Sequence, residues 1–216
     1  MNLPDAHRHG APLSGTVALA VRDLSEIQPQ PTGPWCVGLH PWHLAQERLE
    51  SDLCGLETAL ALPNVVALGE CGLDRACDVP WDLQLRAFEA QLALAHSHDL
   101  PVVLHGVRAN SELLRHRKSA KTPWLWHGFQ GSPELANDLW RHGIALSFGA
   151  ALLASAKMQS AFVSLPPEAV LLESDMTEID MLGLYVFAAA LRNLDASELA
   201  KQVRGNLRRI GISLPD

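Results

Sequence analysis

The chain has 216 residues, of which 48% are hydrophobic and 19% charged, so it is long enough to bury one substantial core. Its formal net charge of −7 excludes the basic composition of a general nucleic-acid binder, and it has no run of about 18 apolar residues that would predict a membrane span. The N-terminal stretch lacks the pattern of a secretory signal, and the four cysteines show no CxxC spacing. We therefore expect a single domain over residues 1–216, located in the cytoplasm and without a membrane partner.

Short apolar runs that predict β-strands recur along the whole chain. In chain order they cover residues 3–5, 16–21, 36–40, 65–70, 102–105, 125–127, 144–148 and 170–175.

Helical patterns lie between the later runs. Apolar residues at helical spacing predict a helix over residues 83–99. Ser132 followed by Pro133 predicts the N-cap and first turn of another helix, which Gly143 ends. Residues 196–211 predict a further helix, near the C-terminus of the sequence.

Eight strands alternating with helices predict an α/β fold built from parallel βαβ units, and eight strands are the number that closes a (β/α)₈ TIM barrel. A doubly wound sheet is the alternative. The chain is short for a barrel, since such domains have about 200 residues at the least. We expect the shortening in the early βα units, where the proline-rich segment 22–35 predicts a loop in place of the second helix.

The motif Asp5-Ala6-His7-Arg8-His9 follows the first predicted strand. Alternate side chains of a strand share one face, so His7 and His9 converge on one point. Two neutral imidazoles at this spacing suit a borderline metal such as zinc. A pair of exposed histidines without a ligand is the alternative for this motif alone.

Four further strands also end on residues that bind metals. These residues are Glu70, His105, His127 and Asp175. In a barrel the carboxyl ends of the strands meet on one face, where catalytic groups lie. Since an ionised carboxylate is costly to bury alone, five strands that end in this way predict a metal site more strongly than a set of separately satisfied polar groups.

Two other residues are candidates for substrate binding. His40, in the segment Gly38-Leu39-His40-Pro41, either contacts substrate or holds the loop that Pro41 stiffens. Arg108 lies three residues past His105, where its planar guanidinium either reaches a phosphate or forms a salt bridge at the surface.

The ordered set of motifs resembles the TatD-type metal-dependent hydrolases, also called TatD-like deoxyribonucleases. The matching stretches are DAHRH, VGLHPWH, ALGECGLD, LPVVLH, WHGFQGS, LLESD and NLRRI; they occur in the family order and cover nearly the whole chain. The residues in these motifs are similar to those of a short subgroup of the family. The resemblance implies a barrel of the amidohydrolase kind with a two-metal site.

Carried over residue by residue, the resemblance implies that Glu70 bridges two divalent ions. His7, His9 and Asp175 would complete the first site, and His105 and His127 the second. Asp175 is also the expected general base, and Glu173 an expected supporting contact. The imidazole-rich ligand set favours Zn, Mn, Fe or Co over Mg, whereas nucleases of the family are often described as magnesium-dependent, so the identity of the metal, with Zn, Mn and Mg as the leading candidates, stays open.

The resemblance implies hydrolysis of DNA phosphodiester bonds from an end, by a water that the two metals activate. The acidic composition favours single strands or frayed ends as the substrate. Two alternatives are a hydrolase of small esters, amides or phosphates and a metal-stabilised interaction subunit without catalysis; the sequence identifies no protein partner. Nucleic-acid binding requires cations and aromatic side chains near the strand ends, and the candidates are Arg8, Arg75, Arg108, Trp42, Trp81 and Phe129.

Overall fold

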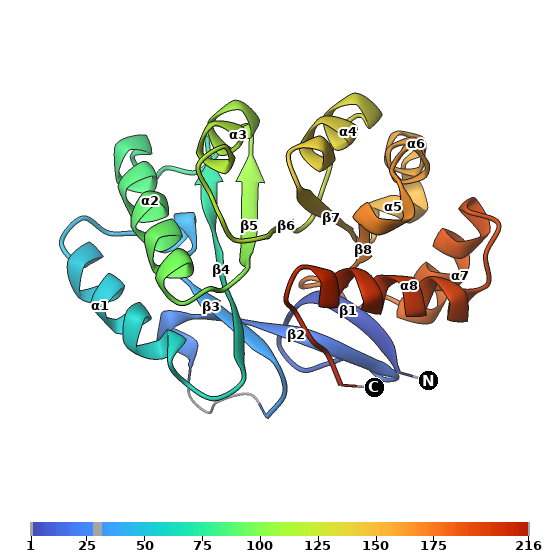
Figure 1. The fold of residues 1–216 in the computed structure, drawn as a ribbon, viewed down its shortest axis with the longest axis horizontal. Coiled ribbons are helices and arrows are strands. Elements are labelled where there is room, and N and C mark those ends of the chain that lie inside the picture. The colour runs from blue at the N-terminus through green and yellow to red at the C-terminus, as the bar shows by residue number, and fades with distance from the viewer. Residues whose placement is uncertain (1, 28–31, 216) are drawn as a thin grey trace. The chain divides into compact units, whose positions relative to one another are not determined.

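The computed structural model describes residues 2–27 and 32–215, and the chain divides into two compact units. Unit 1 comprises Met1–Ala20 and Leu125–Asp216, and unit 2 comprises Val21–Trp124. The single-domain organisation expected from the sequence stays a prediction. All eight predicted strands are present, and they follow chain order in one sheet (Figure 1).

The strands resemble the predicted runs, with differences at their ends. They are β1 Leu3–His9, β2 Thr16–Asp23, β3 Trp35–Gly38, β4 Val65–Asp74, β5 Val102–Val107, β6 Trp124–Trp126, β7 Ile144–Phe148 and β8 Val170–Leu172. Two ends differ in ways that matter for the candidate ligands. Glu70 lies inside β4, because that strand continues to Asp74, and Asp175 lies three residues beyond the end of β8.

The helices of unit 2 are η1 Leu24–Glu26, η2 Pro41–His43, α1 Leu49–Leu60, α2 Trp81–Ser97 and α3 Asn110–Arg117. Those of unit 1 are α4 Pro133–Arg141, α5 Ala151–Ala154, α6 Ala156–Ser164, η3 Pro167–Ala169, α7 Met181–Leu191 and α8 Ala196–Arg209. No helix within the described residues is long and apolar enough to cross a membrane.

Unit 2 is organised around β3, β4 and β5, which pair in parallel. Its helices α1 and α2 lie beside these strands (Figure 1), and α2 buries Leu83, Ala87 and Phe88 at helical spacing. The neighbouring strands approach closely at Gly38, where an added Cβ would lie 2.7 Å from the carbonyl oxygen of Glu70. Only glycine leaves room for the backbone of β4 at this point.

Unit 1 contains a parallel pair, β7 and β8, and a contact between the first strand and the end of the last. The backbone N–H of Asp175 donates to the carbonyl of His7 at 2.8 Å, and the N–H of His9 donates to the carbonyl of Asp175 at 3.1 Å. Helix α8 contacts both β1 and β8. Its N-terminus carries a capping box, in which Asp195 accepts from Glu198 N–H and Glu198 accepts from Asp195 N–H.

The predicted helices are confirmed with shifts of up to two residues at their ends. Ser132 caps α4 by accepting from Leu135 N–H, as expected from Ser132 and Pro133. The predicted loop over residues 22–35 contains only the final residues of β2, η1 and the start of β3 where the structure describes it; residues 28–31 lie outside the described part.

Candidate functional site

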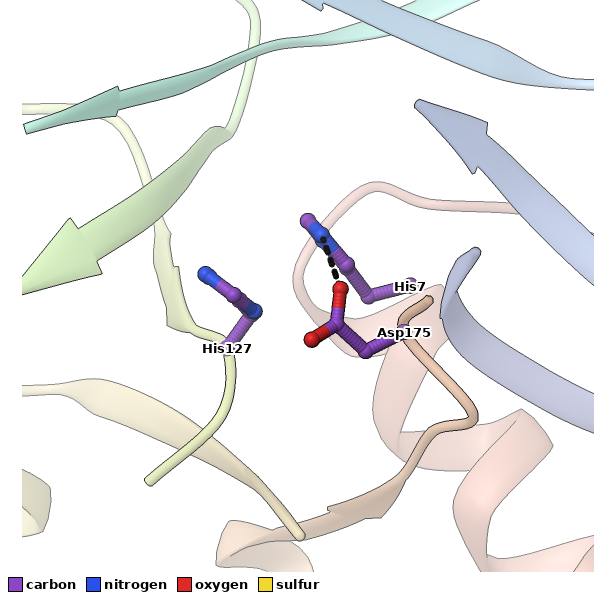
Figure 2. Close-up of side chains that lie close together, drawn as sticks. All are labelled: His7, His127 and Asp175. Carbon is purple, nitrogen blue, oxygen red and sulfur yellow. Dashed lines mark ion pairs between the residues drawn. The ribbon is translucent and has the colours of Figure 1, made fainter. Parts of the chain in front are cut away.

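Unit 1 gathers three predicted metal ligands, His7, His127 and Asp175, whose ligand atoms lie within 4.8 Å of one another. Figure 2 shows the three side chains facing a common space, with the ion pair between His7 and Asp175 dashed. Nε2 of His7 lies 3.7 Å from Oδ1 of Asp175, and the rings of His7 and His127 stack with centroids 4.0 Å apart. Three strand ends thus bring two imidazoles and a carboxylate together.

His9 belongs to the same group, as the alternation along β1 predicted. Its Nε2 lies 3.3 Å from Nε2 of His7 and 3.9 Å from Oδ1 of Asp175. A zinc–nitrogen bond of about 2.05 Å in a tetrahedral site places two ligand nitrogens about 3.3 Å apart. The spacing of the two imidazoles therefore fits a shared divalent ion.

The backbone around Asp175 is held from several directions. Asp175 adopts a backbone φ of +53°, which is uncommon for a residue other than glycine. The Arg8 guanidinium donates to the carbonyls of Asp175 at 3.4 Å and Thr177 at 2.8 Å, and it pairs with Glu178. Arg8 is 5% exposed, so its suggested role as a surface cation for nucleic acid is wrong: it braces the segment that carries Asp175.

Asp5 supports the group of His7, His9, His127 and Asp175 through the residue that precedes Asp175. It is fully buried and accepts hydrogen bonds from the Ser174 hydroxyl at 2.6 Å and from the Ser174 N–H at 3.0 Å. Burial raises the pKa of Asp5 to about 6, against the opposing effect of these bonds. The first residue of the DAHRH motif therefore joins β1 to the segment before Asp175, a role that the sequence analysis did not assign.

Glu173 lies behind His127. Its Oε1 is 3.7 Å from Nδ1 of His127 and accepts from the N–H of Gly128 at 2.7 Å. Burial alone would raise the pKa of Glu173, but the interactions with His127, His7 and Ser147 lower it below its ordinary value. A carboxylate behind an imidazole fixes the orientation and tautomer of a metal-binding histidine, which accords with the supporting role expected for Glu173.

Unit 2 gathers His40, Glu70 and His105. Nδ1 of His105 lies 2.9 Å from Oε1 of Glu70, and Nε2 of His40 lies 3.2 Å from the same oxygen. Glu70 is 5% exposed, so a buried carboxylate is flanked by two imidazoles. This is a second set of donors with the chemistry of a divalent metal site.

The hydrogen bonds of His40 determine what it offers to Glu70. Its Nδ1 accepts from the backbone N–H of Trp42 at 3.2 Å, so in the neutral ring the proton lies on Nε2, which faces Glu70. Burial lowers the pKa of His40 and favours this neutral form, although the neighbouring Glu70 opposes the shift. His40 therefore orients Glu70; its contact with substrate stays a prediction.

Asp74 is a functional candidate that the sequence analysis missed. Its Oδ2 lies 3.1 Å from Nε2 of His105 and accepts from the indole N–H of Trp42 at 2.6 Å. Burial would raise the pKa of Asp74, but these bonds, with one from Ala76 N–H, lower it. Alternation along β4 puts residues 70, 72 and 74 on one face, but the predicted strand ends at Glu70 and therefore leaves Asp74 outside it.

The other side chains suggested for nucleic-acid contact divide into exposed and buried ones. Phe129 is 3% exposed and packs against Phe148, so its suggested role as a stacking surface is wrong. Arg108 is exposed at the end of β5, and its contact with phosphate stays a prediction. Arg75 lies over the ring of Trp81, 3.7 Å from its centroid, whereas Trp42 is 53% exposed.

Comparison with known proteins adds evidence on family and fold. A sequence model of the family described as "TatD related DNase" matches residues 20–210. The chain is 31% identical to a "3'-5' ssDNA/RNA exonuclease TatD" of Erwinia tasmaniensis, over 93% of this chain and 87% of that protein. It is 33% identical to an "Uncharacterized metal-dependent hydrolase" of Haemophilus influenzae, over 68% of this chain but only 60% of that protein's length.

Among solved structures, the TatD homologue YjjV of Escherichia coli matches with a TM-score of 0.81 and 24% identity, over 97% of both chains. This likeness confirms the predicted (β/α)₈-barrel fold, and the backbone bonds between β1 and the segment after β8 join the two ends of the strand order.

Proposed function

Because this chain belongs to the family of TatD-related DNases, we propose that it is a metal-dependent nuclease that removes nucleotides from an end of single-stranded DNA. The observation that carries the proposal is the presence, in each of the two units, of a group of imidazoles and carboxylates with metal-ligand chemistry. Neither alternative, the small-molecule hydrolase or the non-catalytic subunit, is favoured by the comparisons.

We propose that His7, His9, His127 and Asp175 in unit 1, and Glu70 and His105 in unit 2, supply the ligands of two divalent ions of zinc, manganese or magnesium. When bound, such ions supply an activated water and stabilise the charge on the leaving oxygen. The bridging role expected for Glu70 stays a prediction.

Within this proposal, the chain's own residues divide the remaining work. Asp175, whose side chain is 38% exposed, accepts the proton of the attacking water as general base. Glu173 orients His127, and Asp74 holds Nε2 of His105 at 3.1 Å, which leaves Nδ1, 2.9 Å from Glu70, to bind an ion. These contacts set the imidazole orientations before substrate arrives, which is the requirement for a pre-organised site.

The substrate proposal rests on charge and on relatives. An acidic chain has little to offer the phosphates of a long duplex, so single strands or frayed ends suit it better. The Erwinia relative is named for action on single-stranded DNA and RNA, and a human relative is named as a 3'-5' RNA nuclease. DNA is the substrate we propose; RNA is a separate outcome of the test. The cytoplasmic location stays a prediction.

The test combines metal analysis with cleavage. Protein purified without chelator and titrated with Zn²⁺, Mn²⁺ or Mg²⁺ should approach two ions per chain. It should then shorten a single-stranded DNA labelled at its 5' end into a ladder of fragments, faster than a matched duplex with blunt ends. RNA of the same sequence, assayed in parallel, identifies the preferred sugar.

Asp175→Asn protein purified in the same way controls for contaminating nucleases, because a contaminant would cleave equally in both preparations. Metal-loaded protein that shortens neither DNA nor RNA would contradict the nuclease proposal. A saturated metal content near zero would contradict any hydrolytic function of these groups.

A further inference from the structure

Trp42 is the exposed aromatic side chain that the proposed function leaves without a role. Among the large hydrophobic side chains that are exposed in the described part of the chain, it is the only aromatic one; the others are Leu153, Val163, Met176, Leu182 and Val186. At 53% exposure its indole offers an apolar surface to solvent, in the same unit as Glu70 and His105.

The indole is held in one orientation. The indole Nε1–H donates to Asp74 at 2.6 Å, and the backbone N–H of Trp42 donates to Nδ1 of His40 at 3.2 Å. The rings of His40 and His105 meet it edge to face, with centroids 4.7 Å and 5.4 Å away. A side chain fixed in this way loses little further freedom when a ligand stacks on it.

The same contacts determine the kind of ligand that fits. The Nε1–H is the only polar group of the indole, and Asp74 already occupies it. What stays available is π-surface, which attracts any planar ring and does not distinguish one base from another by hydrogen bonds.

The neighbouring cavity does not favour a phosphate. It has a volume of about 330 Å³, and its lining includes His40, His43 and Arg48 but also the carboxylates of Asp23 and Asp52. Asp23 lies 3.2 Å from His43, and the lining sets two carboxylates, Asp23 and Asp52, against the single guanidinium of Arg48. The surface around Trp42 therefore suits a nucleobase better than a sugar–phosphate backbone.

We propose that Trp42 is the stacking platform for a nucleobase beside the scissile phosphate. The proposal rests on the nuclease function above and adds a base-tolerant contact to it. Asp74 links the two parts, because one carboxylate oxygen contacts both the indole and His105. The position of the base is thus tied to the position of a proposed metal ligand.

The test is a double-mutant cycle that combines a substitution in the protein with removal of a base from the substrate. Wild type and Trp42→Ala are assayed on three single-stranded DNAs labelled at the 5' end: one intact, one abasic at the 3'-terminal nucleotide and one abasic at the preceding nucleotide. Stacking predicts that Trp42→Ala lowers kcat/KM on intact DNA by roughly 5- to 150-fold, mainly through KM. On one of the abasic substrates wild type should show a similar loss, and Trp42→Ala no additional one.

Companion variants separate stacking from folding. Trp42→Phe keeps an aromatic face and should retain most of the activity, whereas Trp42→Leu keeps apolar bulk and should resemble Trp42→Ala. Leu182→Ala removes a side chain that is 58% exposed on α7 and should leave kcat/KM unchanged. Metal content and thermal midpoint measured on every variant show whether the fold is intact.

The outcomes distinguish this inference from the proposed function. Equal losses for Trp42→Ala on intact and abasic DNA, or equal activities of Trp42→Leu and wild type, would overturn the stacking role while leaving the nuclease function in place. A wild-type protein that loads metal but cleaves no oligonucleotide would contradict both.

Discussion

At the scale of single residues, some carboxylates belong to the candidate ligand sets and others lie outside them. Glu70 and Asp175 are members of the ligand sets, whereas Asp74, Glu173 and Asp5 are buried carboxylates outside them. Substituting a carboxylate by its amide keeps the shape and removes the charge, so such variants report on charge.

We expect Glu70→Gln to lose one or both metal ions together with activity, because Glu70 is the carboxylate of the unit 2 group. Asp175→Asn should keep most of its metal, since His7 and His9, which are expected to bind the same ion, still provide donors in unit 1. Its turnover should nevertheless fall by about 10²–10⁴-fold if Asp175 is the general base. Metal analysis and steady-state kinetics on both variants check this, and an Asp175→Asn protein that cleaves as fast as wild type would remove Asp175 as the base.

Asp5 predicts a pH dependence of stability in the metal-free protein. Its pKa is about 6 in the folded chain and 3.8 ordinarily, so the folded state holds a proton that the unfolded state has released. The free energy of unfolding should therefore fall as pH rises from about 4 to about 6, by up to about 3 kcal/mol, and stay lower above that range.

The variant Asp5→Asn mimics the protonated carboxyl and isolates this contribution. It should match wild type near pH 4 and exceed wild type above about pH 6, as measured by denaturant unfolding at both values. A difference between the two proteins that does not change with pH would show that Asp5 ionises at an ordinary pKa.

At the scale of elements, the close approach of β3 and β4 depends on Gly38. An added methyl at this position would lie 2.7 Å from the Glu70 carbonyl oxygen and 2.8 Å from the Gly69 backbone, atoms that cannot move independently of the strand. We expect Gly38→Ala to lower the free energy of unfolding by about 2–4 kcal/mol and to reduce metal content by displacing Glu70.

Gly205 is the matched control. It lies within α8, and an added Cβ there meets nothing within 4 Å. Gly205→Ala should raise the free energy of unfolding by about 0.5–1 kcal/mol, because alanine favours the helix. Unfolding curves of both variants give the comparison; a Gly38→Ala protein as stable as wild type would show that the two strands can separate at low cost.

The elements themselves were largely predictable from the sequence, because a strand that is buried on both faces consists of a continuous run of apolar residues. All eight runs became strands, and Ser132, Pro133 and Gly143 marked the ends of α4 closely. The end of β4 was not predictable in this way, because Glu70 interrupts the apolar run while Cys71 and Leu73 continue the strand.

The candidate ligands were predictable because each follows an apolar run, and the grouping of His7, His9, His127 and Asp175 within unit 1 agrees with that pattern. The contacts that orient them were not. Asp74 faces His105 only because β4 and β5 pair in the register that sets Gly72 opposite His105, and register between distant strands is absent from a single sequence. A single sequence also does not show which distant residues cover Arg8 and Phe129, so their burial was not predicted.

At the scale of the whole molecule, metal binding should change both charge and stability. Two divalent ions would bring the net charge from −7 to −3, with the added charge concentrated at buried carboxylates and imidazoles. Each ion present at a hundredfold its Kd stabilises the folded state by about 2.7 kcal/mol. For a chain of this size we therefore expect a rise in thermal midpoint of roughly 5–10 °C per ion over chelator-treated protein.

Calorimetry or fluorescence melting with chelator, and then with each metal in excess, measures this shift. A variant lacking both His7 and His9 should lose the part of the rise that comes from the unit 1 ion. A midpoint unaffected by chelator or metal would contradict resident ions in either group.

The backbone bonds between His7, His9 and Asp175 also impose an order of events on synthesis. These partners are separated by 168 and 166 positions, so a ribosome completes His7 and His9 long before their carboxylate neighbour exists. Contacts of such long sequence separation form late, and a nascent chain stalled after β7 would carry three of the unit 1 histidines without Asp175. Capture of an ion by the complete unit 1 group must therefore follow translation of Asp175, so an unfinished product cannot assemble this part of the proposed nuclease centre.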